Sequence, residues 1–143
     1  MACPSTVNGR GVYFHWLMLI GLCALIFAQS HGLVLTNLPL PVHFDKVLHF
    51  ICFALLAVLF YRAYHSLPFG ASVRILFILS IVSTIGYAVG DELHQRFVPL
   101  RVADKWDLLA DGAGALFGLA LYLLWCRRGG RGRSLRLANQ CRS

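Results

Sequence analysis

The chain has 143 residues, of which 58% are hydrophobic and only 13% are charged. One small water-soluble core cannot bury so much apolar side chain, so the composition excludes an ordinary soluble domain and predicts an integral membrane protein. The formal net charge of +7 lies mainly at the chain ends, without an aromatic-studded basic groove, so we expect no nucleic-acid partner.

Four apolar stretches follow one another along the chain. Each is near the roughly 20 residues that a helix needs to cross about 30 Å of hydrocarbon at about 1.5 Å per residue. The stretches cover residues 12–28, 47–64, 75–90 and 108–126. The sequence therefore predicts an all-α integral membrane bundle of four transmembrane helices over residues 12–126. A short segment, 1–11, precedes it, and a basic tail, 127–143, follows it and is expected to be disordered.

The first stretch also has features of a signal peptide, with Arg10 in front and a weak cleavage site at residues 28–30. Its length of about 17 residues, with His15 and Trp16 near its start, fits an uncleaved helix better. We therefore expect this stretch to remain as the first span.

The distribution of Lys and Arg predicts the orientation, because segments rich in these residues stay on the cytoplasmic side. Nine fall on one side of the four spans: Arg10, Arg62, Arg74, Arg127, Arg128, Arg131, Arg133, Arg136 and Arg142. Four fall on the other: Lys46, Arg96, Arg101 and Lys105. Both termini are therefore expected in the cytoplasm.

All six acidic residues fall into two short polar segments, at residue 45 and over residues 91–111. A charged side chain inside a bilayer costs about 3 kcal/mol or more, so acids at the ends of membrane helices are functional-site candidates by default. The short side chains of Asp45, His49, Asp91 and Glu92 cannot reach far toward water, so we expect them to face a hydrated cavity lined by protein.

Helical spacing predicts which of these groups meet. One face of the fourth helix carries Asp104, Asp107, Asp111, Gly114 and Gly118. The third helix carries a GxxxG motif over residues 86–90, just before its acids. We therefore expect the third and fourth helices to pack closely through small residues and to set their polar ends side by side.

Helix capping is the alternative explanation for some of the acids. Positions typical of an N-cap or a first-turn acid are occupied by Asp45, Asp104 and Asp107. Capping fails for Asp111, about two turns inside its helix, and for Asp91 and Glu92 at a helix C-terminus, where the macrodipole disfavours negative charge. These three acids need partners, for which the candidates are Lys46, His49, Arg96 and Arg101.

These residues match two motifs of a known family. The segment DKVLHFICF over residues 45–53, and the pattern DExxQxFxPxRxxDxxD over residues 91–107 followed by Gly114 and Gly118, resemble the signatures of the VanZ-like membrane proteins. The resemblance covers the second to the fourth span and implies a small protein of the bacterial cytoplasmic membrane. The founding member is associated with low-level resistance to teicoplanin. Many members have Asn where this chain has Asp111.

The leading hypothesis is that the polar cluster at the outer face binds the headgroup of an envelope lipid or a lipid-linked glycan, linked to glycopeptide resistance or envelope maintenance. Lys46 and Arg101 are expected to meet phosphate or another anion. Five other side chains are expected to form hydrogen bonds with sugar hydroxyls or to orient these two basic side chains: Asp91, Glu92, Gln95, Asp104 and Asp107. The candidate site is completed by Asp45, His49 and Asp111.

The alternative is a membrane-embedded transferase or hydrolase acting on a lipid headgroup. Its general acid or base would be His49 or Glu92, or carboxylates would hold a divalent cation. Asp45 lies one turn from His49, a spacing at which a carboxylate orients an imidazole, although a structural hydrogen-bonded histidine is the simpler interpretation. No Cys and His spacing indicates a metal site, and the cofactor, the oligomeric state and the role of the tail stay open.

Overall fold

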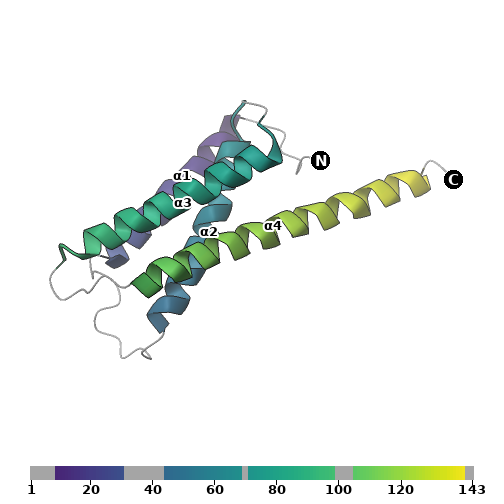
Figure 1. The fold of residues 1–143 in the computed structure, drawn as a ribbon. Helices are drawn as coiled ribbons and strands as arrows, with labels where there is room; N and C mark the ends of the chain where they lie inside the picture. Colours follow the sequence, from purple (N-terminus) through teal and green to yellow (C-terminus); the bar gives the residue numbers. More distant parts are fainter. Residues whose placement is uncertain (1–8, 31–43, 69–70, 99–104, 141–143) are drawn as a thin grey trace.

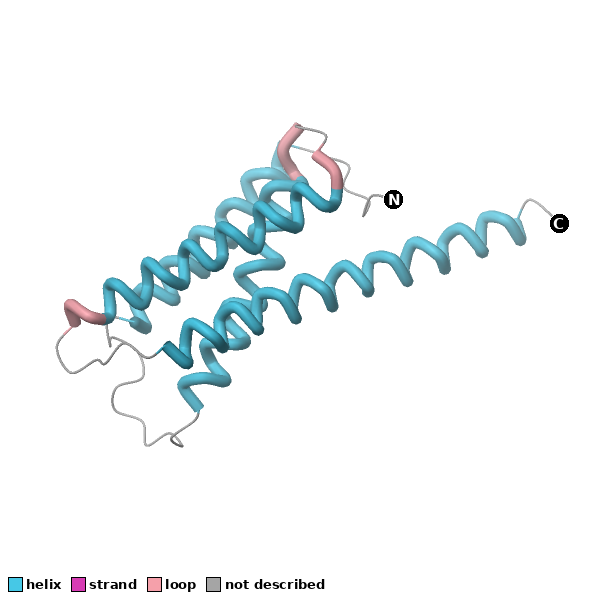
Figure 2. Tube along the Cα trace, in the orientation of Figure 1, coloured by secondary structure: helices cyan, strands magenta, loops and turns pink. Residues whose placement is uncertain are grey.

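The structure is a computed structural model that describes residues 9–30, 44–68, 71–98 and 105–140, with only the backbone described for 9–10, 44–45, 105 and 130–140. The described residues form helices and no strands (Figures 1 and 2). The helices are α1 (Gly9–Ser30), α2 (Phe44–His65), α3 (Val73–Gln95) and α4 (Lys105–Gln140). The predicted all-α class is confirmed.

Each of these helices contains a segment long and apolar enough to cross a membrane. The segments are Gly11–Ser30, Lys46–His65, Val73–Gln95 and Trp106–Gly129. Large apolar side chains cover their outward faces, as Leu17, Ile51, Val82 and Leu121 show with half or more of their surface exposed. Apolar faces of this extent are unfavourable in water and favourable against hydrocarbon, so the described chain is a multi-pass membrane protein.

The chain runs up and down between the two ends of the bundle. The end of α1, the start of α2, the end of α3 and the start of α4 therefore lie at the same end (Figure 1), which we call the polar end. α2 contacts all three other helices, most extensively α4. The buried core follows from this arrangement, since Phe53, Leu56 and Ala57 of α2 are fully buried.

The closest helix contact is the crossing of α4 over α2. A Cβ added at Gly114 would collide with the backbone of Phe50, and one added at Gly118 would come within 2.7 Å of the Ala54 Cβ and carbonyl oxygen. Real side chains do not approach so closely, so both positions require glycine for the backbones to meet. The packing role that the sequence suggests for these two glycines agrees with the structure.

The GxxxG motif of α3 does not pack in this way, so that expectation was wrong. No atom lies within 4 Å of a Cβ added at Gly86 or Gly90, and both residues are exposed. The buried stripe of α3 passes instead through Thr84 and Ala88. Gly86 and Gly90 each follow a member of that stripe by two positions, about 200° around the helix, so they face away from the bundle.

Two helices extend beyond their apolar stretches. α3 starts at the N-cap Ser72, whose hydroxyl accepts from the Ile75 N–H at 3.4 Å, and continues through both acids to Gln95. α4 has a helical backbone past Cys126 into the basic segment 127–143, as far as Gln140. The acids of α3 therefore lie on helical turns, and the register of the helix fixes the direction of their side chains.

Candidate functional site

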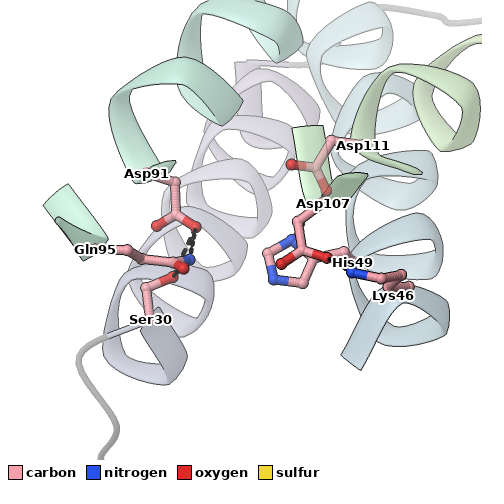
Figure 3. A network of polar contacts seen from close by, with 7 residues as sticks. All are labelled: Ser30, Lys46, His49, Asp91, Gln95, Asp107 and Asp111. Atoms are coloured by element: carbon pink, nitrogen blue, oxygen red, sulfur yellow. Dashed lines mark hydrogen bonds and ion pairs between the residues drawn. The ribbon is translucent and has the colours of Figure 1, made fainter. Parts of the chain in front are cut away.

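Polar side chains gather at the polar end in two groups, which Figure 3 shows side by side. The α1–α3 group consists of Ser30, Asp91 and Gln95. The α2–α4 group consists of Lys46, His49, Asp107 and Asp111. The first group joins α1 to α3 and the second joins α2 to α4, so each group connects helices that are not consecutive in the sequence.

The α1–α3 group centres on the carboxylate of Asp91. The Ser30 hydroxyl donates to Asp91 Oδ2 at 2.7 Å, and the Gln95 amide donates to the same oxygen at 3.1 Å. The amide also lies 3.4 Å from the Ser30 hydroxyl oxygen. Asp91 and Gln95 are one turn apart on α3, and Ser30 is the last residue of α1. All three side chains are buried, so this carboxylate is held by neutral donors away from water.

The α2–α4 group consists of two parallel pairs. Lys46 Nζ lies 2.8 Å from Asp107 Oδ1, and His49 Nδ1 lies 3.0 Å from Asp111 Oδ1. The basic residues are three positions apart on α2 and the acids four apart on α4, so each helix presents its two groups on one face. The side chains are 34% exposed for Lys46, 11% for His49 and 1% for Asp111. The lysine pair is thus at the edge, and the histidine pair lies inside.

Glu92 connects the two groups electrostatically. Its carboxylate interacts with Asp107, His49, Asp111 and Asp91. Asp111 in turn interacts with Asp91 across the boundary between the groups. These charged groups are therefore near enough to affect one another, and charges that are partly buried are screened less than charges on an exposed surface. We therefore treat both groups and Glu92 as one unit, the polar cluster, made of Ser30, Lys46, His49, Asp91, Glu92, Gln95, Asp107 and Asp111.

Three carboxylate oxygens of the polar cluster are buried and have no hydrogen-bond partner among the described residues. They are Asp91 Oδ1, Glu92 Oε1 and Asp111 Oδ2. An unsatisfied buried acceptor costs about 1–3 kcal/mol, and native proteins keep few of them. The cluster therefore has hydrogen-bonding capacity that its own described side chains do not use.

The polar cluster is also acidic. It contains the four carboxylates of Asp91, Glu92, Asp107 and Asp111 against two basic side chains, Lys46 and His49. Both basic side chains already contact carboxylates. Within the described residues, no three His, Cys, Asp or Glu side chains are grouped so that they could hold a metal ion. Among the described residues, the carboxylates of the cluster therefore outnumber its basic side chains.

Most of the candidate site residues of the sequence analysis meet in this cluster. The structure brings together Lys46, His49, Asp91, Glu92, Gln95, Asp107 and Asp111. The side chains of Asp45, Arg101 and Asp104 lie outside the described residues, so their roles, including the orientation of His49 by Asp45, stay predictions. The expected contact of Lys46 with an anion also stays a prediction.

The sequence analysis had left one partner among several candidates and had missed another. Asp111 was expected to pair with one of four basic residues, and the structure identifies that residue as His49. Ser30 was missed as a site residue altogether, although it is buried against Asp91. A hydroxyl just after the first apolar stretch could have indicated this role. That indication requires knowing that α1 continues past residue 28 to Ser30.

A comparison with protein families decides which family this helical arrangement represents. A family model described as VanZ/LLP1 matches residues 10–126, which reach into all four helices. The chain belongs to the VanZ/LLP1 family. The resemblance inferred from the two motifs is therefore confirmed.

One relative of the chain comes from a fungus. The protein named "Uncharacterized protein C11E3.10" of Schizosaccharomyces pombe is 30% identical over 91 residues, which are 64% of this chain and 53% of the relative. The chain therefore spans about half the length of that relative. No solved structure matches the chain.

Proposed function

We propose that this VanZ/LLP1-family protein binds the headgroup of an envelope lipid or a lipid-linked glycan in its polar cluster. The supporting observation is the set of buried carboxylate oxygens of Asp91, Glu92 and Asp111 that have no described partner at the end of the membrane spans. In a bacterium, such binding would serve envelope maintenance or glycopeptide resistance of the teicoplanin type, in a cytoplasmic membrane with both chain termini inside.

The depth of the polar cluster in the membrane supports a headgroup ligand. Trp106 and Trp125 of α4 are 56% and 71% exposed. They are about 19 residues apart, so about 28 Å of helix separates them, which matches the hydrocarbon thickness. Tryptophan prefers the membrane interface, so the two rings mark its two boundaries. Asp107 then lies at one boundary, where headgroups join their acyl chains, and Asp111 lies about 6–8 Å deeper, at the level of the hydrocarbon.

The surroundings of the polar cluster favour entry from the lipid. Apolar side chains that are about half or more exposed lie among the cluster residues on α2, α3 and α4. They are Val47, Ile51, Leu93 and Leu109. A lipid can leave its acyl chains against these apolar surfaces while its headgroup reaches the carboxylates. A fully water-soluble ligand has no acyl chains to place against these apolar surfaces.

Mass spectrometry of the lipids retained by the gently extracted protein tests the proposal. We expect one lipid class to be enriched over the bulk membrane and to fall at least about tenfold in Asp91→Asn, a loss of about 1.4 kcal/mol in binding. Ser83→Ala is the matched control, because its hydroxyl bonds to the Tyr64 hydroxyl at 2.8 Å, away from the cluster. Identical lipid profiles in all three proteins would exclude a headgroup site here.

The His49–Asp111 pair favours a second candidate function, which is acid–base chemistry on the bound headgroup. A carboxylate 3.0 Å from an imidazole nitrogen fixes the orientation of the ring, as a general base requires. Purified protein incubated with candidate phospholipids and polyprenyl-linked substrates, with and without chelator, should then yield a changed lipid. His49→Gln should abolish the change and keep the lipid bound. Unchanged substrates throughout would leave binding as the function.

A further inference from the structure

The charge balance of the polar cluster defines the chemical class of headgroup. We propose that the cluster takes a primary ammonium group carried by a lipid headgroup, an inference that rests on the function proposed above. A primary ammonium carries one positive charge and three hydrogen-bond donors and has no acceptor. The carboxylate oxygens of the cluster that have no described partner are complementary to such an ammonium, because they are acceptors and belong to acidic side chains.

Two of the unpartnered oxygens belong to side chains that water hardly reaches. Asp91 is 5% exposed and Asp111 is 1% exposed, and Oδ1 of the first and Oδ2 of the second have no hydrogen-bond partner among the described residues. They come from different helices, α3 and α4, which contact each other. Glu92, the next residue of α3, has a third buried oxygen without a partner in the described part of the chain. The acceptors without a described partner therefore come from two helices that contact each other at the polar end of the bundle.

Other ligand classes fit the polar cluster less well. An anion would approach four carboxylates, and the described cations of the cluster, Lys46 and His49, already contact Asp107 and Asp111. Neutral hydroxyls would satisfy the acceptors but leave the excess negative charge buried, which is unfavourable. A quaternary ammonium brings charge without donors. A primary ammonium meets both requirements at once.

The inference is tested by titrating the wild-type protein in detergent with three lipids of the same acyl chains, followed by native mass spectrometry. Phosphatidylethanolamine has the primary ammonium, phosphatidylcholine has the same group fully methylated, and phosphatidylglycerol has hydroxyls and no cation. We expect phosphatidylethanolamine to bind at least tenfold more tightly than either. The fourth ligand is soluble glycerophosphoethanolamine, which lacks acyl chains and is expected to bind at least a hundredfold more weakly.

Matched variants locate the ammonium. Asp91→Asn and Asp111→Asn keep the shape of the side chain and remove one charge, and each should reduce the preference for phosphatidylethanolamine at least fivefold. Ser83→Ala, outside the cluster, should leave the preference unchanged. Because the comparison of lipids is made first on the wild-type protein, a variant that fails to fold does not decide the result.

The outcomes separate this inference from the function on which it rests. If phosphatidylglycerol or phosphatidylcholine binds as tightly as phosphatidylethanolamine, the ammonium class is wrong while headgroup binding stands. If soluble glycerophosphoethanolamine binds as tightly as the lipid, the ligand is a free amine and the lipid part is overturned. If none of the lipids binds saturably, the proposed function fails together with the inference.

Discussion

Asp107 and Asp111 lie one turn apart on α4, and each has a basic partner on α2. The pair of Asp107 with Lys46 is at the edge of the protein, where the lysine side chain is 34% exposed. The pair of Asp111 with His49 is almost completely enclosed. Exposed ion pairs contribute about 0–1 kcal/mol, whereas breaking a buried pair leaves an uncompensated polar group and costs several times more.

Double-mutant cycles should therefore give different coupling energies for the two pairs. For Lys46→Met with Asp107→Asn we expect a coupling energy below about 1 kcal/mol. For His49→Leu with Asp111→Leu we expect about 1–3 kcal/mol, because each single change leaves a buried polar atom without its partner. Reversible unfolding of the protein in mixed micelles measures both. A larger value for the lysine pair would contradict the burial that separates them.

The sequence indicated which residues need partners better than it indicated the partners. The depth of Asp111 inside an apolar stretch predicts that its carboxylate must be paired, and this is independent of tertiary structure. The choice of His49 depends on how α4 is rotated against α2, which spacing along one helix does not determine. Ser30 shows the same limit, since a single hydroxyl at a helix end has no distinctive pattern until Asp91 is placed opposite it.

At the scale of helices, the fold depends on the α2–α4 crossing. The glycines at positions 114 and 118 let the α4 backbone reach Phe50 and Ala54 of α2. The same face of α4 carries Asp107 and Asp111 one to three turns earlier, so the crossing also sets the distance across which these acids meet α2. Packing in the apolar part of the bundle and geometry in the polar cluster are therefore coupled.

Alanine substitutions should separate these glycines from those of α3. Gly114→Ala and Gly118→Ala should each destabilise the protein by about 1–3 kcal/mol, because the new methyl group must push α4 away from α2. Gly86→Ala and Gly90→Ala should be neutral or stabilise by up to about 1 kcal/mol, since they meet open space and alanine favours helix. Thermal unfolding in detergent provides the comparison. Equal losses at all four positions would mean that the α2–α4 crossing is not the tight contact.

The sequence predicted the helices well and the packing of their faces poorly, for one physical reason. Length and apolarity identify a membrane span, because lipid demands both. In a soluble helix the apolar face indicates which side packs against the core. In a membrane span the lipid-facing side is apolar too, so hydrophobic periodicity no longer indicates the packed face. Small residues remain as a signal, and Gly86 and Gly90 carry the same signal as Gly114 and Gly118 without making the contact.

For the whole molecule, the described helices bring the N-terminal end of α1 to the same side of the bundle as the α2–α3 connection (Figure 1). The polar end lies opposite. The excess of Arg on the first side predicts that it faces the cytoplasm. The polar cluster would then open toward the outer leaflet, where an envelope lipid is available to it.

Cysteine accessibility tests this orientation. In a background without the five native cysteines, Phe97→Cys reports on the polar end, because Phe97 is 79% exposed just after α3. Pro68→Cys, exposed in the connection after α2, reports on the other end. A membrane-impermeant maleimide should label the first variant in intact cells and the second only after lysis. The reverse pattern would place the polar cluster in the cytoplasmic leaflet.

The polar contacts of the cluster also constrain the order of assembly. Ser30 bonds to Asp91 between α1 and α3, and His49 pairs with Asp111 between α2 and α4. Neither contact lies within a hairpin of consecutive helices, so the N-terminal and C-terminal hairpins each insert with their acids or bases unsatisfied. Only docking of the two hairpins completes both contacts. If the chain were divided within the α2–α3 connection and its two halves were synthesised separately, these polar contacts would therefore favour the association of the two halves.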